Sequence, residues 1–147
     1  MSITYTAAID LVFGRAKAAI DANKSIVGNP DPVVRYIGRD EETVPPAGRY
    51  LVEVQSFGSG NRQSGFGVTK LMYTATGTLY LRIFAPQAGA NNYRKGQLFA
   101  DALKNSFRGK LITGAVWYRN ARVQELPPEK GAYRFNVLVD YTYDELQ

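Results

Sequence analysis

The chain has 147 residues, 45% of them apolar, and a formal net charge of +5. This length is typical of one domain that buries its own core, so we expect a single domain over residues 1–147. The sequence contains no cysteine and no histidine, which excludes disulfides, thiol nucleophiles, cysteine-ligated metals and every catalytic arrangement built on histidine. Catalysis would depend on paired carboxylates, a lysine or an oxygen-ligated Mg²⁺ or Ca²⁺ ion. We therefore expect neither an enzyme nor a cofactor.

An amphipathic helix is predicted at the start of the chain. Apolar side chains recur at helical spacing from residue 4 to residue 22, and Asn23 is a suitable end. The predicted core face comprises Ile9, Val12, Phe13, Ala16, Ala19 and Ile20. The N-terminus has no basic region before its apolar residues, and no apolar run reaches the length of a membrane span. We expect a soluble protein of the cytoplasm.

The next elements are a turn at 28–32, a short strand at 33–37 and a polar, proline-rich loop at 38–48. Alternation over 49–57 predicts a strand. Residues 57–67 then read FGSGNRQSGFG, which predicts a long glycine-rich hairpin loop, with 66–73 as the returning strand. A turn follows at 76–78 and a strand at 79–85, which Pro86 ends.

A second helix follows, capped by Asn91 or Asn92 and ended by Gly109. Its predicted core face comprises Leu98, Phe99, Ala102, Leu103 and Phe107. Two strands, 115–126 and 133–143, close the chain around a turn at 126–132. In the last strand alternate residues from Tyr133 to Tyr143 are apolar or aromatic, the clearest core signal in the sequence. The element order favours an α+β domain, a mostly antiparallel sheet with two helices packed on one face.

The glycine-rich stretch does not match a nucleotide-binding motif. Its glycines do not fit G-x-G-x-x-G, and the residues after it favour a strand where a phosphate-binding loop requires a helix. A loop that orders against a partner is one interpretation, and an unimportant hairpin loop is the other. On the first interpretation the partner-binding residues of this stretch are Asn61, Arg62, Gln63, Phe66 and Lys70.

Charge is unevenly distributed along the chain. Residues 54–124 hold ten basic residues and one acid, Asp101, whereas residues 125–147 hold five acids and two bases. This separation fits a basic face that meets a polyanion, contact between unlike faces of neighbouring copies, or a solvated surface with a chance imbalance. We place Asp40, Glu41, Glu42, Arg119 and Arg122 at a subunit interface. The three acids also fit a solvated loop, and their spacing does not match a calcium loop.

Further basic residues are candidates for contact with a partner. Arg94 and Lys95 lie in the first turn of the second predicted helix, where positive charge opposes the helix dipole and fits contact with an anion. Arg82 lies on a predicted strand next to Tyr80. Basic residues with aromatics on a sheet are typical of proteins that bind single-stranded nucleic acid, although the aromatics suit a core equally well.

The layout as a whole resembles a known family. LYLRIFAPQAGANN leads into a helix ending LFADALKNSFRGK, and VLVDYTYDEL closes the chain. Together with the N-terminal helix and the glycine-rich stretch, this resembles the small phage tail-terminator proteins, which include the lambda-type minor tail protein and related prophage families. The match is one of length and order of elements, and no residue role is carried over from it.

The resemblance implies a structural protein of the phage tail. Family members form a hexameric ring that caps the tail tube, ends its polymerisation and joins it to the head connector, while DNA passes non-specifically through the lumen. The implied partners are other copies of the chain, the tube protein and the connector protein. The implied locations are the host cytoplasm during assembly and the virion tail. A nucleic-acid-binding module using residues 54–124 is the alternative, and a carboxylate enzyme ranks last.

Overall fold

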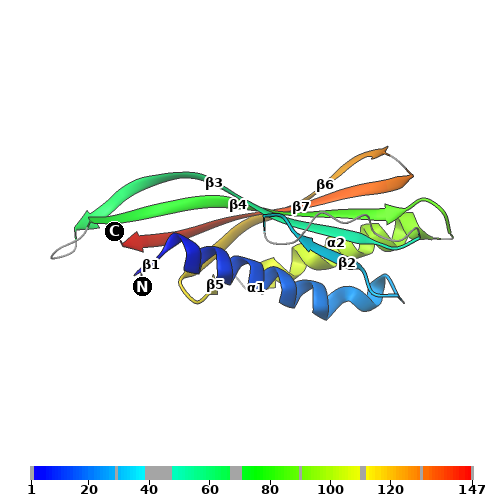
Figure 1. Cartoon of the computed structure of the whole chain (residues 1–147), viewed down its shortest axis with the longest axis horizontal. Helices are drawn as coiled ribbons and strands as arrows, with labels where there is room; N and C mark the ends of the chain where they lie inside the picture. Colours follow the sequence, from blue (N-terminus) through cyan, green and yellow to red (C-terminus); the bar gives the residue numbers. More distant parts are fainter. Residues whose placement is uncertain are drawn as a thin grey trace.

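The computed structural model describes residues 2–28, 30–38, 48–66, 71–89, 91–109, 112–129 and 131–146. The elements in chain order are β1 (Ser2–Ile3), α1 (Tyr5–Asn23), the 3₁₀ helix η1 (Lys24–Ile26), β2 (Val33–Tyr36), β3 (Leu51–Phe66), β4 (Leu71–Pro86), α2 (Asn92–Gly109), β5 (Ile112–Thr113), β6 (Val116–Glu129) and β7 (Ala132–Leu146). Figure 1 shows long strands above both helices.

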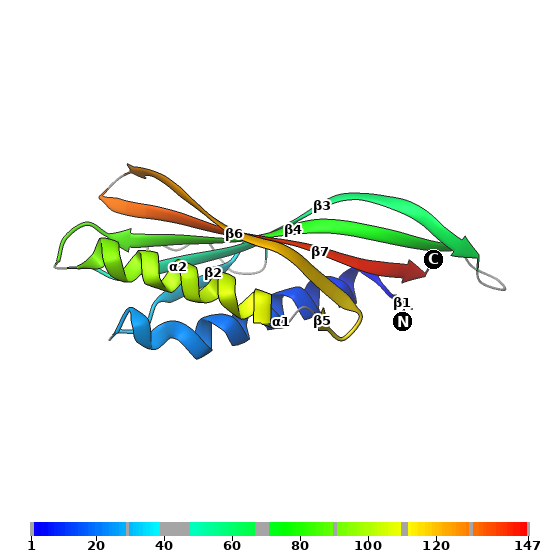
Figure 2. The same ribbon diagram turned by 180° about the vertical axis from the view of Figure 1, so that it is seen from behind.

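The strands form one sheet in the order β2-β3-β4-β7-β6-β5, and β1 pairs with β7 beside it. The four long strands β3, β4, β7 and β6 pair antiparallel with one another, whereas β1 pairs in parallel with β7 and β2 pairs in parallel with β3. Both helices cover the same face of the sheet (Figures 1 and 2). The predicted α+β class, with a mostly antiparallel sheet and two helices on one face, is therefore confirmed.

The apolar stripe of α1 is buried as predicted, except that the buried face is rotated slightly about the helix axis. Thr4 caps the helix by accepting a hydrogen bond from the Ala7 backbone N–H at 3.2 Å, as N-cap threonines commonly do. Ala8 is fully buried, whereas Ile9 is only partly buried. Arg15 ties α1 to α2, because its guanidinium donates to the Ser106 carbonyl oxygen at 2.8 Å.

The core face of α2 differs at its edges from the sequence prediction. Phe99, Ala100, Leu103 and Phe107 are buried, but Leu98 is 44% exposed. A helix of 3.6 residues per turn buries a stripe of limited width, and the five predicted positions span more than that stripe. Leu98 therefore falls at its margin and faces solvent beside β6.

The alternation of β7 places its apolar side chains in the core. Phe135, Val137, Val139, Tyr141 and Tyr143 are each at most 3% exposed, as the sequence pattern predicts. β4 contributes alternate residues from the neighbouring strand to the same face, where they are also buried: Ala75, Leu79, Leu81, Ile83 and Ala85. The core thus lies between these two strands and the helices.

Three predicted breaks in the chain fall within strands. Residues 57–66, which the sequence assigns to a loop, continue β3 and pair with β4, with bulges between Gly58 and Gly60 and between Gln63 and Gly65. The predicted turn at 76–78 lies inside β4, and residues 126–129 end β6. Glycine disfavours strands locally, but pairing with neighbouring strands outweighs that preference. The connection at 67–70 lies outside the described residues.

Buried tyrosines make the fold sensitive to alkali. Burial raises the pKa of Tyr50, and it raises the pKa of Tyr143 from 10.0 to about 12. Because the folded pKa lies above the unfolded value, the contribution of Tyr143 to stability is complete below pH 10 and is lost as the pH rises toward 12. We expect cooperative unfolding in that range, followed by circular dichroism and tyrosinate absorbance. Tyr143→Phe should move the transition to higher pH, and full ionisation of the tyrosines near pH 10 without unfolding would contradict this account.

Candidate interaction surface

No helix in the described part of the chain covers the second face of the sheet, which we call the open face (Figure 2). Strand alternation assigns residues to it, since their neighbours along each strand point into the core. The open-face positions that bear on binding are Glu53, Gln55, Phe57, Thr78, Tyr80, Arg82, Trp117, Arg119, Arg122, Asp140, Thr142 and Asp144. They come from β3, β4, β6 and β7, so the face extends across all four long strands.

Asp140 is the centre of a polar network on the open face. Its carboxylate accepts hydrogen bonds from the Thr78 hydroxyl of β4 at 3.0 Å and the Asn120 amide of β6 at 3.1 Å, and it lies 3.5 Å from the Arg122 guanidinium. Burial raises the pKa of this carboxyl, but the hydrogen bonds and the nearby positive charge together lower the pKa below 3.8. Asp140 therefore carries its negative charge among arginines at neutral pH.

Other charges on this face are also balanced. Glu53 lies 2.8 Å from the guanidinium of Arg35, and both side chains are largely buried. Arg119 lies opposite Asp140 in the strand register and donates to the Thr142 hydroxyl at 3.0 Å. The open face thus alternates acidic and basic groups where the sequence alone indicated a basic segment.

Aromatic side chains lie among these charges. The Arg82 guanidinium stacks over Tyr80 at 5.2 Å from the ring centroid, and Phe57 meets Tyr80 edge to face at 5.3 Å. Phe57 is 45% exposed and Trp117 39% exposed. Exposed aromatics beside arginine are typical of protein interfaces.

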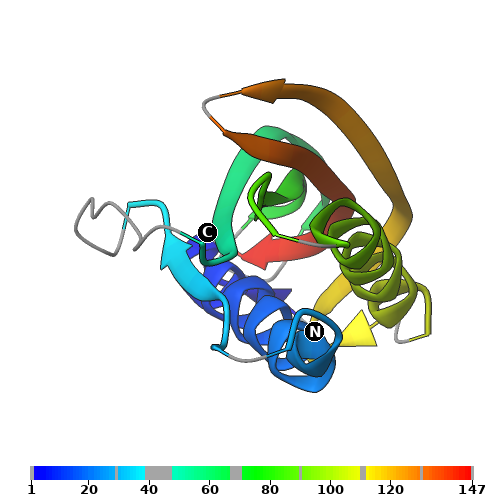
Figure 3. The same ribbon diagram turned by 90° about the vertical axis from the view of Figure 1, so that its right-hand side faces the viewer.

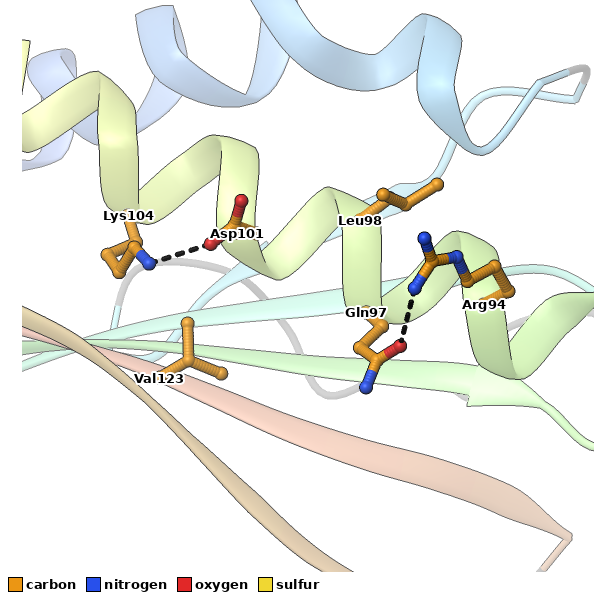
Figure 4. Close-up of a pocket in the computed structure, with 6 residues that line it drawn as sticks. All are labelled: Arg94, Gln97, Leu98, Asp101, Lys104 and Val123. Carbon is orange, nitrogen blue, oxygen red and sulfur yellow. Dashed lines mark hydrogen bonds and ion pairs between the residues drawn. The ribbon is translucent and has the colours of Figure 1, made fainter.

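A second surface is a groove between α2 and β6, which we call the α2–β6 groove (Figure 4). Its volume is about 400 Å³, and its lining comprises Arg94, Gln97, Leu98, Asp101, Lys104 and Val123. Lys104 pairs with Asp101 at 2.7 Å, and Arg94 donates to the Gln97 side-chain oxygen at 3.3 Å. The Lys104 partner lowers the pKa of the Asp101 carboxyl. Apolar side chains and charges therefore line the same groove.

The predicted site residues do not form one cluster. Arg82, Arg119 and Arg122 share the open face, whereas Arg94 lies in the α2–β6 groove on the helix side. Lys95 lies in the first turn of α2 and is partly buried.

The predicted residues of the glycine-rich stretch are only partly described. The backbone of Asn61, Arg62, Gln63 and Phe66 belongs to the distal half of β3. Lys70 and the three acids Asp40, Glu41 and Glu42 lie outside the described residues.

The sequence did not predict the α2–β6 groove. The helical pattern predicts Leu98 in the core, and no pattern marks Val123 as an interface residue. Their proximity depends on packing between elements that are separated along the chain, which no local pattern encodes. The available signal was the excess of apolar positions on α2 over what one buried stripe accommodates.

Two further results bear on the class of function. Within the ranges that the structure describes, no three acidic side chains gather closely enough to hold a metal ion. No helix in these ranges has the length and apolar character needed to cross a bilayer.

Comparison with known proteins identifies the fold and no family. No family model matches the chain, and no curated protein matches it. A solved structure whose name describes no function aligns with 91% of this chain and 94% of its own, with a TM-score of 0.55 and 15% sequence identity. Identity this low supports a shared fold alone, so function has to be inferred from the surfaces of this chain.

Proposed function

We propose that this chain is a structural protein of a phage or prophage tail. It assembles with copies of itself into a ring that caps the tail tube, and the family resemblance implies six subunits. The ring ends tube polymerisation and joins the tube to the head connector. The proposal rests on the resemblance in the order of elements and on the two surfaces described above.

The observation that carries the proposal is the presence of two unlike surfaces on one small fold. The open face carries alternating charges and exposed aromatics, and the α2–β6 groove is lined by charges and apolar side chains. A contact between unlike surfaces of two copies repeats from subunit to subunit, and it closes into a ring when the rotation allows. Such a protein acts through shape and association and needs no catalytic group.

The open face suits contact with another protein. Its charges come in pairs, so a partner with the complementary pattern gains specificity and orientation. Exposed aromatics such as Phe57 and Trp117 supply the anchors that carry most of the affinity in protein interfaces.

Deletion of the gene from the phage that encodes this chain tests the proposal. We expect tails of abnormal and variable length by electron microscopy, because nothing ends tube polymerisation. Supplying the wild-type chain from a plasmid should restore uniform tails joined to heads. Tails of normal length in the deletion, with heads attached, would contradict the proposal.

Nucleic-acid binding is the second candidate, favoured by the Tyr80 and Arg82 pair and by exposed Trp117 on the same face. Stacking of bases on aromatics with arginine at the phosphates is the usual design for single strands. Fluorescence anisotropy with single- and double-stranded DNA at low and moderate salt separates the candidates. Salt-dependent binding at micromolar protein supports this one, and its absence removes it.

A further inference from the structure

The α2–β6 groove combines two features of a docking site for a peptide segment. Leu98 and Val123 face it from α2 and β6 and are 44% and 37% exposed. Figure 4 shows both side chains at the groove together with Arg94 and Lys104. Solvent-exposed Leu and Val side chains favour an apolar partner, and the cations favour an acidic one.

The charge of Arg94 is poorly balanced. Its guanidinium donates to the neutral side-chain oxygen of Gln97, and it has no carboxylate partner among the described residues. Lys104 is paired, but Asp101 is its partner in the same helix and is itself 57% exposed. An incoming carboxylate therefore finds one cation without an acidic partner and a second at the opposite end of the groove.

A segment of this chain has the complementary chemistry. Residues 39–47 read RDEETVPPA, in which one arginine precedes three consecutive acids and a threonine, a valine and two prolines follow them. The acids match Arg94 and Lys104, and Val44 with the prolines matches the exposed Leu98 and Val123. Proline also loses little conformational entropy on binding, so such a segment binds at a low entropic cost.

The ends of the segment and the groove belong to different parts of the sheet. The segment follows Gly38, after β2, and precedes Gly48, before β3, whereas β6 lies three strands beyond β3 and the groove lies on the helix side of β6. A segment supplied by a neighbouring copy gives a contact that repeats from subunit to subunit, as the proposed ring requires. Figure 3 shows β2 and α2 on opposite sides of the molecule.

We propose that the α2–β6 groove binds residues 39–47 of a second copy of this chain. The contact joins one side of a subunit to the other side of its neighbour, so it repeats head to tail. As a ring contact it rests on the proposed function. The pairing assigns Asp40, Glu41 and Glu42 to Arg94 and Lys104, not to Arg119 and Arg122, whose guanidinium groups bond to neighbours on the open face.

A peptide experiment tests the groove directly. The isotope-labelled protein carries Asp40→Lys, Glu41→Lys and Glu42→Lys, which leaves the groove intact and removes its own acidic segment. A peptide of residues 39–47 should shift the amide resonances of Leu98 and Val123 in NMR spectra. The same peptide with its three acids replaced by amides should bind at least about tenfold more weakly. Shifts elsewhere, or none at millimolar peptide, would overturn the proposal.

Charge exchange tests the contact between subunits. Arg94→Glu with Lys104→Glu, and separately the three acid-to-lysine changes, should each reduce association in sedimentation velocity, and the combined variant should restore it. Lys17→Glu, on the exposed side of α1, is the matched control and should associate normally. If rings form equally well in the Arg94→Glu, Lys104→Glu variant and in the three-acid variant, the groove contact is refuted and the proposed function still stands. Peptide binding in the groove together with normal tails in the deletion refutes the function alone.

Discussion

Phe107→Ala is expected to lower the free energy of unfolding by about 3–5 kcal/mol, the usual cost of removing a buried phenylalanine. The ring is 1% exposed and joins three elements. It meets Tyr118 of β6 edge to face at 5.2 Å, and the Arg15 guanidinium of α1 lies 5.3 Å from its centroid. Truncation leaves a cavity at the junction of α1, α2 and β6, and it removes the aromatic face under a partly buried cation. Urea unfolding followed by circular dichroism measures the loss.

Phe57→Ala is the matched control for this prediction. Its side chain is 45% exposed on the open face, so the same truncation should cost less than about 1 kcal/mol. The loss of unfolding free energy in Phe107→Leu should lie between those of Phe107→Ala and Phe57→Ala, because leucine fills part of the cavity. Equal losses at Phe57 and Phe107 would mean that Phe107 is not a core residue.

Gly77→Ala should destabilise the protein by about 1–3 kcal/mol, the usual cost of overpacking a core. A Cβ at this position would overlap the hydroxyl oxygen and Cζ of Tyr141 and would lie 2.8 Å from the Phe57 carbonyl oxygen. Tyr141 is buried and hydrogen-bonded to Ser56, so its ring has little room to move. The backbone oxygen is also fixed by strand pairing. Thermal unfolding at neutral pH gives the measurement.

Gly58 offers the control, because it lies directly opposite Gly77 in the strand register. A Cβ on Gly58 meets no atom within 4 Å, so Gly58→Ala should be nearly neutral. Tyr141→Leu in the Gly77→Ala background removes the clashing phenol and should recover part of the loss, which a double-mutant cycle measures. Similar losses for the two glycines would show that strand propensity, not the contact with Tyr141, sets the cost.

The elements with strong periodicity were predictable, and their boundaries were less so. The α1 stripe and the alternation of β7 are confirmed because each depends on burial of one face, which local spacing reports. The sequence predicts a loop at Gly58 and a turn at Gly77, since glycine weakens local strand propensity. Their strand conformation comes from long-range pairing of β3, β4 and β7.

In the candidate site, too, local spacing predicts some features and the packing of distant elements decides others. Arg119 and Arg122 are three residues apart, so strict alternation places them on opposite faces of the sheet. A bulge between them, with Asn120 at a φ of 56°, brings both to the open face. That Leu98 and Val123 line the same groove likewise follows from how α2 packs on β6. Neither result is encoded in local spacing.

By itself the sequence determined the helical and strand stripes that bury a core, and its lack of cysteine and histidine removed most catalytic chemistry. The tertiary structure alone decided that the basic segment divides between an open face with paired charges and a groove lined by both charged and apolar side chains. The physical reason is that burial pattern is a local property of the chain. The neighbours of a charge, by contrast, depend on strand register, bulges and the packing of distant elements.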